Sequence, residues 1–246
     1  MNIYSALQIG SFHSNHCEDF TTISELDSGK KLIAVMDGCT MGEDSVFASI
    51  LVGKILKKIS KKYYYRHFRD TGRDQDLKTY LKEILRELVT ELKQVKNQLG
   101  LETIELLTTL VLGIIDENTF DAEIVVIGDG LICVDGHYTE FEQDDRPDYL
   151  AYHLSKNFES WFDDQEQFLS VHAFSNLAIC TDGIYTFKNF GNSKNQKDEE
   201  TFKTFLLEDI EGCEQENFLA NKLLFIRDEW KHSPSDDLAL IRIIRS

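Results

Sequence analysis

Acidic residues at the ends of apolar strands constrain this chain of 246 residues more than any other feature. The acidic segments that share this context are Asp37-Gly38 after residues 32–36, Gly128-Asp129-Gly130 after residues 124–127, Asp182-Gly183 after residues 177–181, Asp236-Asp237 before residues 238–241, and Glu18-Asp19 before a strand that starts at Phe20. Any one of them is compatible with a simple turn, because aspartate and glycine both tolerate positive φ. Taken together, carboxylates at the ends of neighbouring strands can converge on one rim of a sheet.

A rim of this kind suits divalent cations. Carboxylates at close range raise one another's pKa unless a cation neutralises them. Mg²⁺ and Mn²⁺ favour sites made of oxygen atoms, and a glycine after the aspartate lets its own carbonyl approach the metal. Two such ions about 3.5–4 Å apart hold a bridging water, lower its pKa and bind a phosphoryl group for in-line attack. The spacing alone leaves both interpretations open, turn residues or a two-metal site.

The rest of the chain is typical of a single α+β domain. Strands are predicted over residues 3–9, 20–26, 31–36, 108–115, 122–127, 131–134, 177–180 and 238–244. Helical patterns cover residues 43–62, 75–99, 149–162 and 217–230. The hairpin-like turns between strands favour mainly antiparallel sheets, and the order of elements favours α+β over a regular βαβ arrangement. Only two prolines and no low-complexity linker interrupt the chain, which indicates one domain.

Composition excludes several functions. The chain carries 43 acidic and 26 basic residues, for a net charge of −17, and this average field repels polyanions such as nucleic acids. The N-terminus lacks the pattern of a signal peptide, and no stretch reaches the roughly 18 apolar residues of a membrane span. The five cysteines form no CxxC pair, so they indicate neither a zinc site nor a disulfide framework. We therefore expect a cytoplasmic protein that binds neither nucleic acid nor membranes.

The ordered set of short motifs resembles the protein phosphatase 2C family of metal-dependent serine/threonine protein phosphatases. The motifs are Glu18-Asp19-Phe20, Val35-Met36-Asp37-Gly38, Thr108-Thr109, Ile127-Gly128-Asp129-Gly130, Ile179-Cys180-Thr181-Asp182-Gly183 and Ser235-Asp236-Asp237. They follow the family's order with similar spacing and span about residues 8 to 244. The resemblance implies a four-layer αββα sandwich of two mainly antiparallel sheets flanked by helices. It also implies one catalytic domain over residues 1–246, with a variable flap-like segment at about 187–215.

The resemblance assigns most of the strand-end acids to two Mg²⁺ or Mn²⁺ ions. Asp37 would bridge both ions. Glu18 and the carbonyl of Gly38 would serve the second ion, and Asp182 and Asp236 would serve the first. The nucleophile implied is a metal-activated water held through Asp37, Asp182 and Asp236, acting on phosphoserine or phosphothreonine monoesters of a phosphorylated protein substrate.

Further acids have supporting roles by the same resemblance. Asp129 would join Asp182 at a weakly held third ion, and Asp19 and Asp237 would support the metal ligands from behind. Members of the family often carry an acid four residues after the strand-end aspartate. In this chain that position is Thr186, which argues against a tightly bound third ion. The residue after the last metal aspartate is commonly asparagine in the family and is Asp237 here.

One departure concerns phosphate binding. The family usually carries an arginine four residues before Glu18, and this position is Ser14. His13 or His16 could contact the phosphate instead, or both could be ordinary surface histidines. Two functions therefore stay open: an active phosphatase, and a catalytically weak or inactive phosphatase-fold module that binds a phosphorylated partner.

Overall fold

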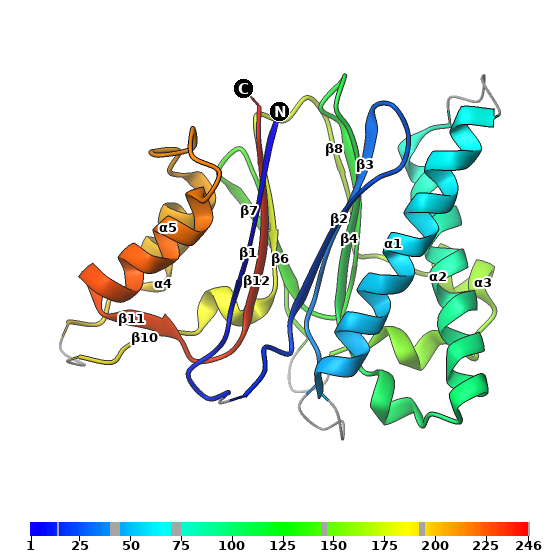
Figure 1. Cartoon of the computed structure of the whole chain (residues 1–246), viewed down its shortest axis with the longest axis horizontal. Helices are drawn as coiled ribbons and strands as arrows, with labels where there is room; N and C mark the ends of the chain where they lie inside the picture. Colours follow the sequence, from blue (N-terminus) through cyan, green and yellow to red (C-terminus); the bar gives the residue numbers. More distant parts are fainter. Residues whose placement is uncertain (14, 40–44, 70–74, 144–146, 192–194, 246) are drawn as a thin grey trace.

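Two five-stranded antiparallel sheets lie face to face at the centre of the computed structural model (Figure 1). The structure describes residues 1–246 except 14, 40–44, 70–74, 144–146, 192–194 and 246. One sheet has the order β1 (Asn2–Gln8), β12 (Leu238–Ile244), β9 (Asn176–Cys180), β6 (Gly130–Val134) and β7 (His137–Phe141). The other has the order β2 (Phe20–Glu25), β3 (Lys30–Met36), β4 (Leu110–Asp116), β5 (Ala122–Ile127) and β8 (Phe168–Val171). A short ribbon pairs β10 (Phe187–Asn189) with β11 (His232–Pro234).

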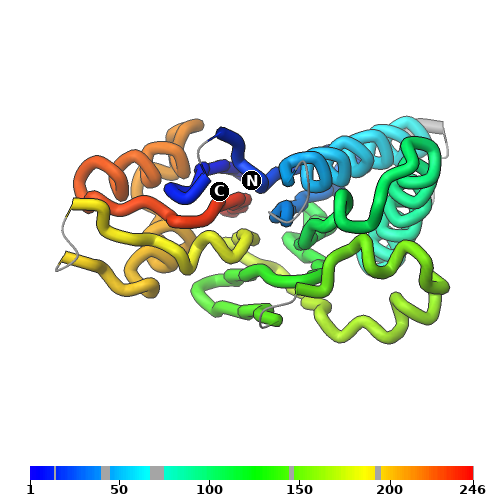
Figure 2. The backbone as a smooth tube through the Cα atoms, turned by 90° about the horizontal axis from the view of Figure 1, so that it is seen from below, coloured from blue at the N-terminus to red at the C-terminus, as the bar shows by residue number. Residues whose placement is uncertain are grey.

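Helices cover the outer face of each sheet, as Figures 1 and 2 show from two directions. Over the sheet that contains β2 to β5 lie α1 (Ser45–Arg69) and α2 (Leu77–Leu99), with α3 (Phe158–Asp163) beside α2. Over the sheet that contains β1 and β12 lie α4 (Glu199–Lys203) and α5 (Phe218–Phe225). These two helices continue into the π-helical turns η5 (Thr204–Glu208) and η6 (Ile226–Trp230). The α+β sandwich with two antiparallel sheets is confirmed.

Three apolar layers explain why the sequences of the central strands are apolar at successive positions. In β3, Ile33 and Val35 belong to the layer between the sheets, whereas Leu32, Ala34 and Met36 belong to the layer under α1 and α2. Successive side chains of a strand point to opposite faces, so a strand covered on both sides needs apolar residues at every position. A third layer packs the β1–β12 sheet against α4 and α5.

Element ends match the sequence-based expectation where local capping signals exist. Helix α2 begins after Asp76, whose carboxylate accepts the backbone N–H of Thr79, and it ends at Gly100 with φ +69°. These are an N-cap and a left-handed C-cap. Helix α1, by contrast, continues to Arg69, beyond the predicted end at residue 62.

Two expectations about elements are wrong. The single helix predicted over residues 149–162 is two pieces, the 3₁₀ turn η2 (Leu150–His153) and α3, separated by a bend that leads to the N-cap Asn157. The strands β7, β8, β10 and β11 are not predicted from the sequence. They are only three to five residues long and have largely exposed or mixed patterns, so they lack a clear alternation.

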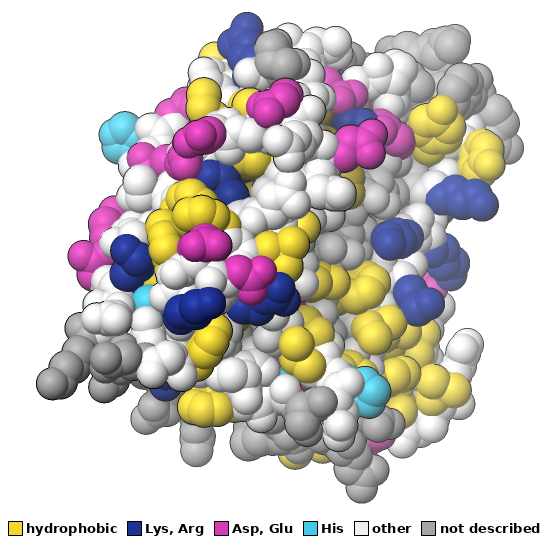
Figure 3. All heavy atoms as spheres, turned by 60° about the vertical axis from the view of Figure 1, so that its left-hand side comes forward, with side chains coloured by type: hydrophobic (Ala, Val, Ile, Leu, Met, Phe, Trp, Pro, Cys, Tyr) yellow, Lys and Arg dark blue, Asp and Glu magenta, His cyan; other side chains and the backbone are white. Residues whose placement is uncertain are grey.

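The surface carries both signs of charge. On the face drawn in Figure 3, most acidic side chains lie at the upper left, whereas a group of basic side chains lies at the right, and apolar side chains lie between them. Among the described residues, no helix has the length and hydropathy that a bilayer span requires.

Candidate active site

The acidic segments lie at one edge of the two sheets, the lower edge in Figure 1. Strands β2 and β3 pair antiparallel, so Asp19 just before β2 and Asp37 just after β3 emerge at the same end of the ladder. In the other sheet β9 and β12 pair antiparallel, and their ends at this edge carry Asp182 and Asp236. Both sheets therefore place carboxylates on one rim.

Two threonines fix the backbone of Asp37. The Thr108 hydroxyl donates to the Asp37 carbonyl over 2.7 Å, and the Thr109 backbone N–H donates to the same oxygen over 2.9 Å. The Asp37 N–H in turn donates to Thr109 Oγ1 over 3.2 Å. The Thr108-Thr109 motif thus holds the strand-end residue in place from the neighbouring strand.

Asp19 lies behind Asp37 and is almost fully buried, with 2% of its surface exposed. The Thr181 hydroxyl donates to Asp19 Oδ2 over 2.6 Å, whereas Asp19 Oδ1 has no hydrogen-bond partner among the described residues. Burial raises the pKa of Asp19 to about 7, with the charges of Asp182 and Asp237 adding to the rise. Burial also raises the pKa of Asp37 well above its usual range, reinforced by the charges of Asp19 and Asp182.

Asp182 and Asp129 complete the cluster from the other sheet. Burial, together with the charges of Asp236 and Asp129, raises the pKa of Asp182 to about 6. Burial raises the pKa of Asp129 as well, against a hydrogen bond from the Gln143 backbone, and Asp129 Oδ1 lacks a partner among the described residues. The contributions of neighbouring charges to these pKa values show that the carboxylates of the rim repel one another.

Asp237 has a different role from the other acids. Its buried carboxylate accepts the backbone N–H of Gly10 over 2.6 Å, the backbone N–H of Glu18, and a hydrogen bond with His13 Nδ1 over 2.8 Å. It thus ties Gly10, His13 and Glu18 to the rim. Its negative charge beside Asp236 is offset by these donors, which explains why an acid is tolerated at this position.

The two candidate histidines differ in position. His13 Nε2 lies 3.7 Å from Asp236 Oδ1, so the structure brings His13 to the rim. Burial by itself would lower the pKa of His13, but the hydrogen bond and charge of Asp237 outweigh it, and the pKa is raised. His16 is exposed. Ser14, the position of the missing arginine, lies outside the described residues.

The glycines of the Asp-Gly pairs are explained by close packing rather than by turns. Of the glycines at the rim, Gly128 has positive φ (+87°), whereas Gly38 and Gly183 are not among the described residues with positive φ. A Cβ on Gly183 would lie 1.8 Å from the Asp237 carbonyl oxygen, and one on Gly38 would lie 2.3 Å from the Ser45 carbonyl oxygen. Asp182 opens the 3₁₀ turn η3 (Asp182–Tyr185), so the hairpin-turn interpretation of this pair is wrong.

The donor set fits a hard divalent cation in kind and in charge. Among the ion pairs of the described residues, none joins a lysine or arginine to Asp19, Asp37, Asp182 or Asp236, and the cationic group that approaches the rim is His13. The unpartnered oxygens of Asp19 and Asp129 are hard ligands of the type that Mg²⁺ and Mn²⁺ prefer. In the described part of the chain, however, no three His, Cys, Asp or Glu side chains already surround one point as a closed metal cage.

The raised pKa values predict how the stability of the metal-free protein depends on pH. In an unfolded chain the pKa of an aspartate is about 3.9. In the fold, burial and neighbouring charges raise the pKa of Asp19 to about 7 and that of Asp182 to about 6. Between these values the folded state holds more protons, so the free energy of unfolding falls as pH rises from about 4 to 7. We expect a higher melting temperature at pH 5 than at pH 7.5 in EDTA. Asp19→Asn should reduce this difference, and an unchanged slope in the variant would contradict the assignment.

The comparisons with known proteins agree with this architecture. The family model described as protein phosphatase 2C matches residues 12–224, and the chain belongs to that family. A bacterial serine phosphatase is similar in fold, with a TM-score of 0.64, 14% identity and coverage of 100% of this chain and 98% of that one. The serine/threonine phosphatase Stp1 from Staphylococcus aureus has a TM-score of 0.62, 13% identity and coverage of 99% and 94%. No curated protein sequence matches the chain.

The sequence interpretation missed two supporting residues. Thr181 not only donates to Asp19 but also accepts the backbone N–H of Ala239 through its hydroxyl over 2.9 Å, which joins β9 to β12 at the rim. Thr186 Oγ1 accepts the backbone N–H of Asp236 over 3.1 Å and donates to the Gly183 carbonyl over 2.9 Å. A polar residue at the end of a fully apolar strand is the available signal for Thr181, because a buried hydroxyl needs partners.

Proposed function

We propose that this protein hydrolyses phosphoserine or phosphothreonine monoesters on proteins with the help of two Mg²⁺ or Mn²⁺ ions. The observation that carries the proposal is the convergence of Asp19, Asp37, Asp182 and Asp236 from two sheets. Burial and neighbouring carboxylates raise the pKa values of Asp19, Asp37 and Asp182. Keeping so many acids together without lysine or arginine destabilises a metal-free fold, and bound cations would remove that cost. Membership of the protein phosphatase 2C family supports the same reaction.

Different residues of the chain would bind each ion. Asp37 and the Gly38 carbonyl, with Glu18, would hold one ion, and Asp182 and Asp236, again with Asp37, would hold the other. Asp129 beside Asp182 is the candidate for a weak third ion. When bound, the ions supply a water of lowered pKa and positive charge for the phosphoryl oxygens.

Other residues set the geometry around these ligands. Thr108 and Thr109 hold the backbone of Asp37, and Asp19 supports it from behind. Asp237 holds His13 through Nδ1, which leaves Nε2 on the side of Asp236 and available to a phosphate oxygen. No serine or cysteine nucleophile is needed, and no phosphoenzyme is expected.

The first test is hydrolysis of a generic aryl phosphate in the presence of Mn²⁺, Mg²⁺ or EDTA. We expect turnover with either cation and loss of at least about 100-fold in EDTA, because the attacking water depends on the ions. Turnover that is unaffected by EDTA would contradict the proposal.

The second candidate function is a weak or inactive module that binds a phosphorylated partner. The departure at Ser14 favours it, because a serine cannot replace the bidentate contact of an arginine with phosphate. Metal binding by calorimetry without any turnover would favour this alternative. In either case we propose a cytoplasmic location, which the five free cysteines support, and no nucleic-acid or membrane partner.

A further inference from the structure

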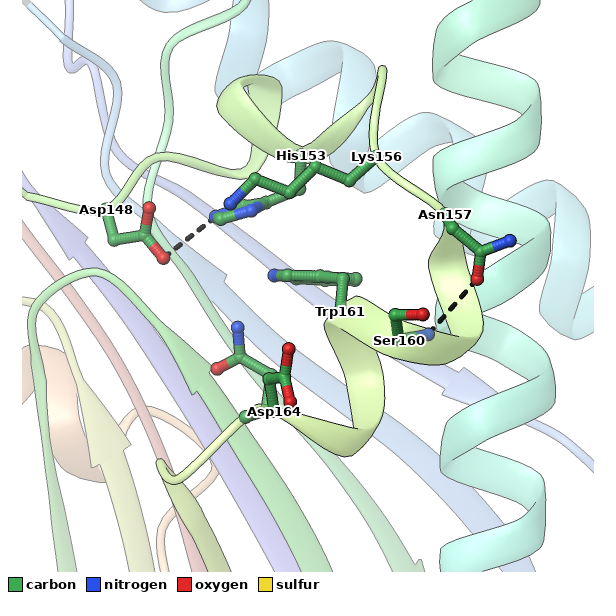
Figure 4. A pocket seen from close by; sticks show the side chains of 8 residues that line it. Asp148, His153, Lys156, Asn157, Ser160, Trp161 and Asp164 are labelled. Carbon is green, nitrogen blue, oxygen red and sulfur yellow. Dashed lines mark hydrogen bonds and ion pairs between the residues drawn. The ribbon is translucent and has the colours of Figure 1, made fainter.

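A pocket with a volume of about 450 Å³ lies beside the candidate site and has no part in the roles assigned above. Its lining residues, seven of which are labelled in Figure 4, are Asp148, His153, Lys156, Asn157, Ser160, Trp161, Asp164 and Gln165. The pocket lies at the break between η2 and α3, where the sequence predicts a continuous helix.

Two stacked rings form the buried wall of the pocket. His153 and Trp161 are 4% and 5% exposed, and their ring centroids lie 4.7 Å apart at an interplanar angle of 21°. His153 Nε2 is hydrogen-bonded to Asp148 Oδ2 over 2.8 Å, as the dashed line in Figure 4 shows. An ion pair between Lys82 of α2 and Asp163 ties α3 to the long helix beneath it. The wall is therefore a fixed part of the fold.

Each of the two rings carries a nitrogen without a hydrogen-bond partner in the described part of the chain. These atoms are His153 Nδ1 and Trp161 Nε1. In Figure 4 the indole nitrogen points into the space between His153 and Asp164. An unsatisfied buried polar group costs about 1–3 kcal/mol, so a ligand that satisfies both atoms gains from the contact.

The two nitrogens differ in hydrogen-bonding character. Burial lowers the pKa of His153 despite the opposing charge of Asp148, which favours the neutral ring. Since Nε2–H donates to Asp148, Nδ1 is left as an acceptor, whereas the indole N–H can only donate. The wall thus offers one acceptor and one donor, on rings whose centroids lie 4.7 Å apart.

The pocket is joined to the candidate site by short backbone links. The Gln143 backbone N–H bonds Asp129, and the Gln143 side-chain carbonyl accepts the Asp148 N–H over 2.6 Å. The Leu150 N–H donates to the carbonyl of Thr108, the residue that holds Asp37. These direct hydrogen bonds place the pocket next to the segments that carry Asp37 and Asp129, where the phosphoresidue of a peptide substrate would bind.

We propose that the pocket is a docking subsite for the peptide chain of the phosphoprotein substrate and takes an amide group from it. A C=O of the peptide would accept from Trp161 Nε1, and an N–H on the same side would donate to His153 Nδ1. A primary side-chain amide offers this pair, and so does one extended residue, whose own N–H and C=O point to the same side. This inference rests on the proposed function.

Other ligand classes match the pocket less well. A carboxylate or phosphate only accepts hydrogen bonds and would meet Asp148 and Asp164, and an ammonium only donates and would meet Lys156. Less than 1 Å² of either ring nitrogen is exposed, so the ligand enters by displacing rim side chains. Lys156, Asn157, Ser160 and Asp164 at the pocket's rim are all exposed, and Asn157 caps α3 through its hydrogen bond with the Ser160 N–H, so Lys156 and Asp164 are the side chains to be displaced.

The kinetic test compares two substrates and two matched variants. The substrates are an aryl phosphate, which has no amide, and a capped phosphoserine peptide with alanines on both sides. Trp161→Phe keeps an aromatic ring and removes the N–H, and Trp230→Phe is the control at the chain's other tryptophan. We expect Trp161→Phe to raise KM for the peptide about 5-fold, the effect of one hydrogen bond of about 1 kcal/mol. Its kcat and its aryl phosphate kinetics should match those of the control.

A binding measurement separates failure of this inference from failure of the proposed function. The indole N–H signal of Trp161 in a ¹⁵N–¹H spectrum is identified by its absence in Trp161→Phe. We expect it to shift when the same peptide with serine in place of phosphoserine is added, while the Trp230 signal stays. This readout needs no turnover, so it decides the subsite even if aryl phosphate is not hydrolysed.

A second peptide, with glutamines in place of the alanines, shows whether the bound amide belongs to the backbone or to a side chain. A shift of the Trp161 signal already seen with the alanine peptide assigns the contact to a backbone amide. A shift seen only with the glutamine peptide assigns it to a side-chain amide. An unshifted Trp161 signal with both peptides overturns the inference. So does a Trp161→Phe variant that changes KM equally for the peptide and the aryl phosphate.

Discussion

Asp37→Asn is expected to lower kcat/KM for Mn²⁺-dependent phosphate ester hydrolysis by at least about 100-fold. The side chain lies at the centre of the acidic cluster, and the amide that replaces it has the same shape but carries no charge for a cation. Loss of one group that stabilises transition-state charge costs about 10²–10³-fold in other enzymes. The measurement is aryl phosphate turnover across Mn²⁺ concentrations, so that weakened metal binding and weakened chemistry are seen separately.

The same substitution should leave the fold intact and raise its metal-free stability. The pKa of Asp37 is raised well above its usual range because burial and neighbouring acids disfavour its charge, and asparagine removes that charge. Asp228→Asn is the control, since Asp228 is exposed and pairs with Arg227 away from the rim. Wild-type turnover in Asp37→Asn, or an equal loss in Asp228→Asn, would contradict the assigned role.

Arg242→Ala should lower the free energy of unfolding by about 3–5 kcal/mol, because it leaves several buried carbonyl groups without a donor and opens a cavity. Arg242 is fully buried in β12, and burial lowers its pKa to about 10, so it stays charged at neutral pH. Its guanidinium donates to Asn176 Oδ1 and to the backbone carbonyls of Leu206, Glu208 and Asp209, over 2.8–2.9 Å. Alanine would leave these carbonyls at the end of η5 unpaired and open a cavity.

Urea unfolding gives the measurement for Arg242→Ala. Arg227→Ala is the matched control, because Arg227 is exposed and its ion pair with Asp228 should contribute less than about 0.5 kcal/mol. If the two arginine variants differ by less than about 1 kcal/mol, the guanidinium network does not anchor η5 to the sheet.

Most of the long strands and helices could be predicted from the sequence, and the motifs at the strand ends indicated the family. Continuous apolar runs such as residues 32–36 required strands covered on both faces, and the structure provides a helical layer and a second sheet for them. Asp76 and Gly100 determined the ends of α2, because capping is a local interaction. The acids at the strand ends indicated the rim, since antiparallel pairing brings such ends together without further information.

The hydrogen-bond partners of the buried polar residues could be seen only in the folded chain. Asp19 meets Thr181 and Gly10 meets Asp237 across more than 160 residues of chain, and no local pattern encodes such contacts. For the same reason the sequence suggested turn chemistry for Gly183, where a backbone carbonyl from a distant strand in fact leaves no room for a Cβ. Arg242 lies in an apolar strand, and its guanidinium is hydrogen-bonded by carbonyls at the end of the π-helical turn η5. Local free energies determine elements, whereas buried polar groups are positioned by partners that folding brings to them.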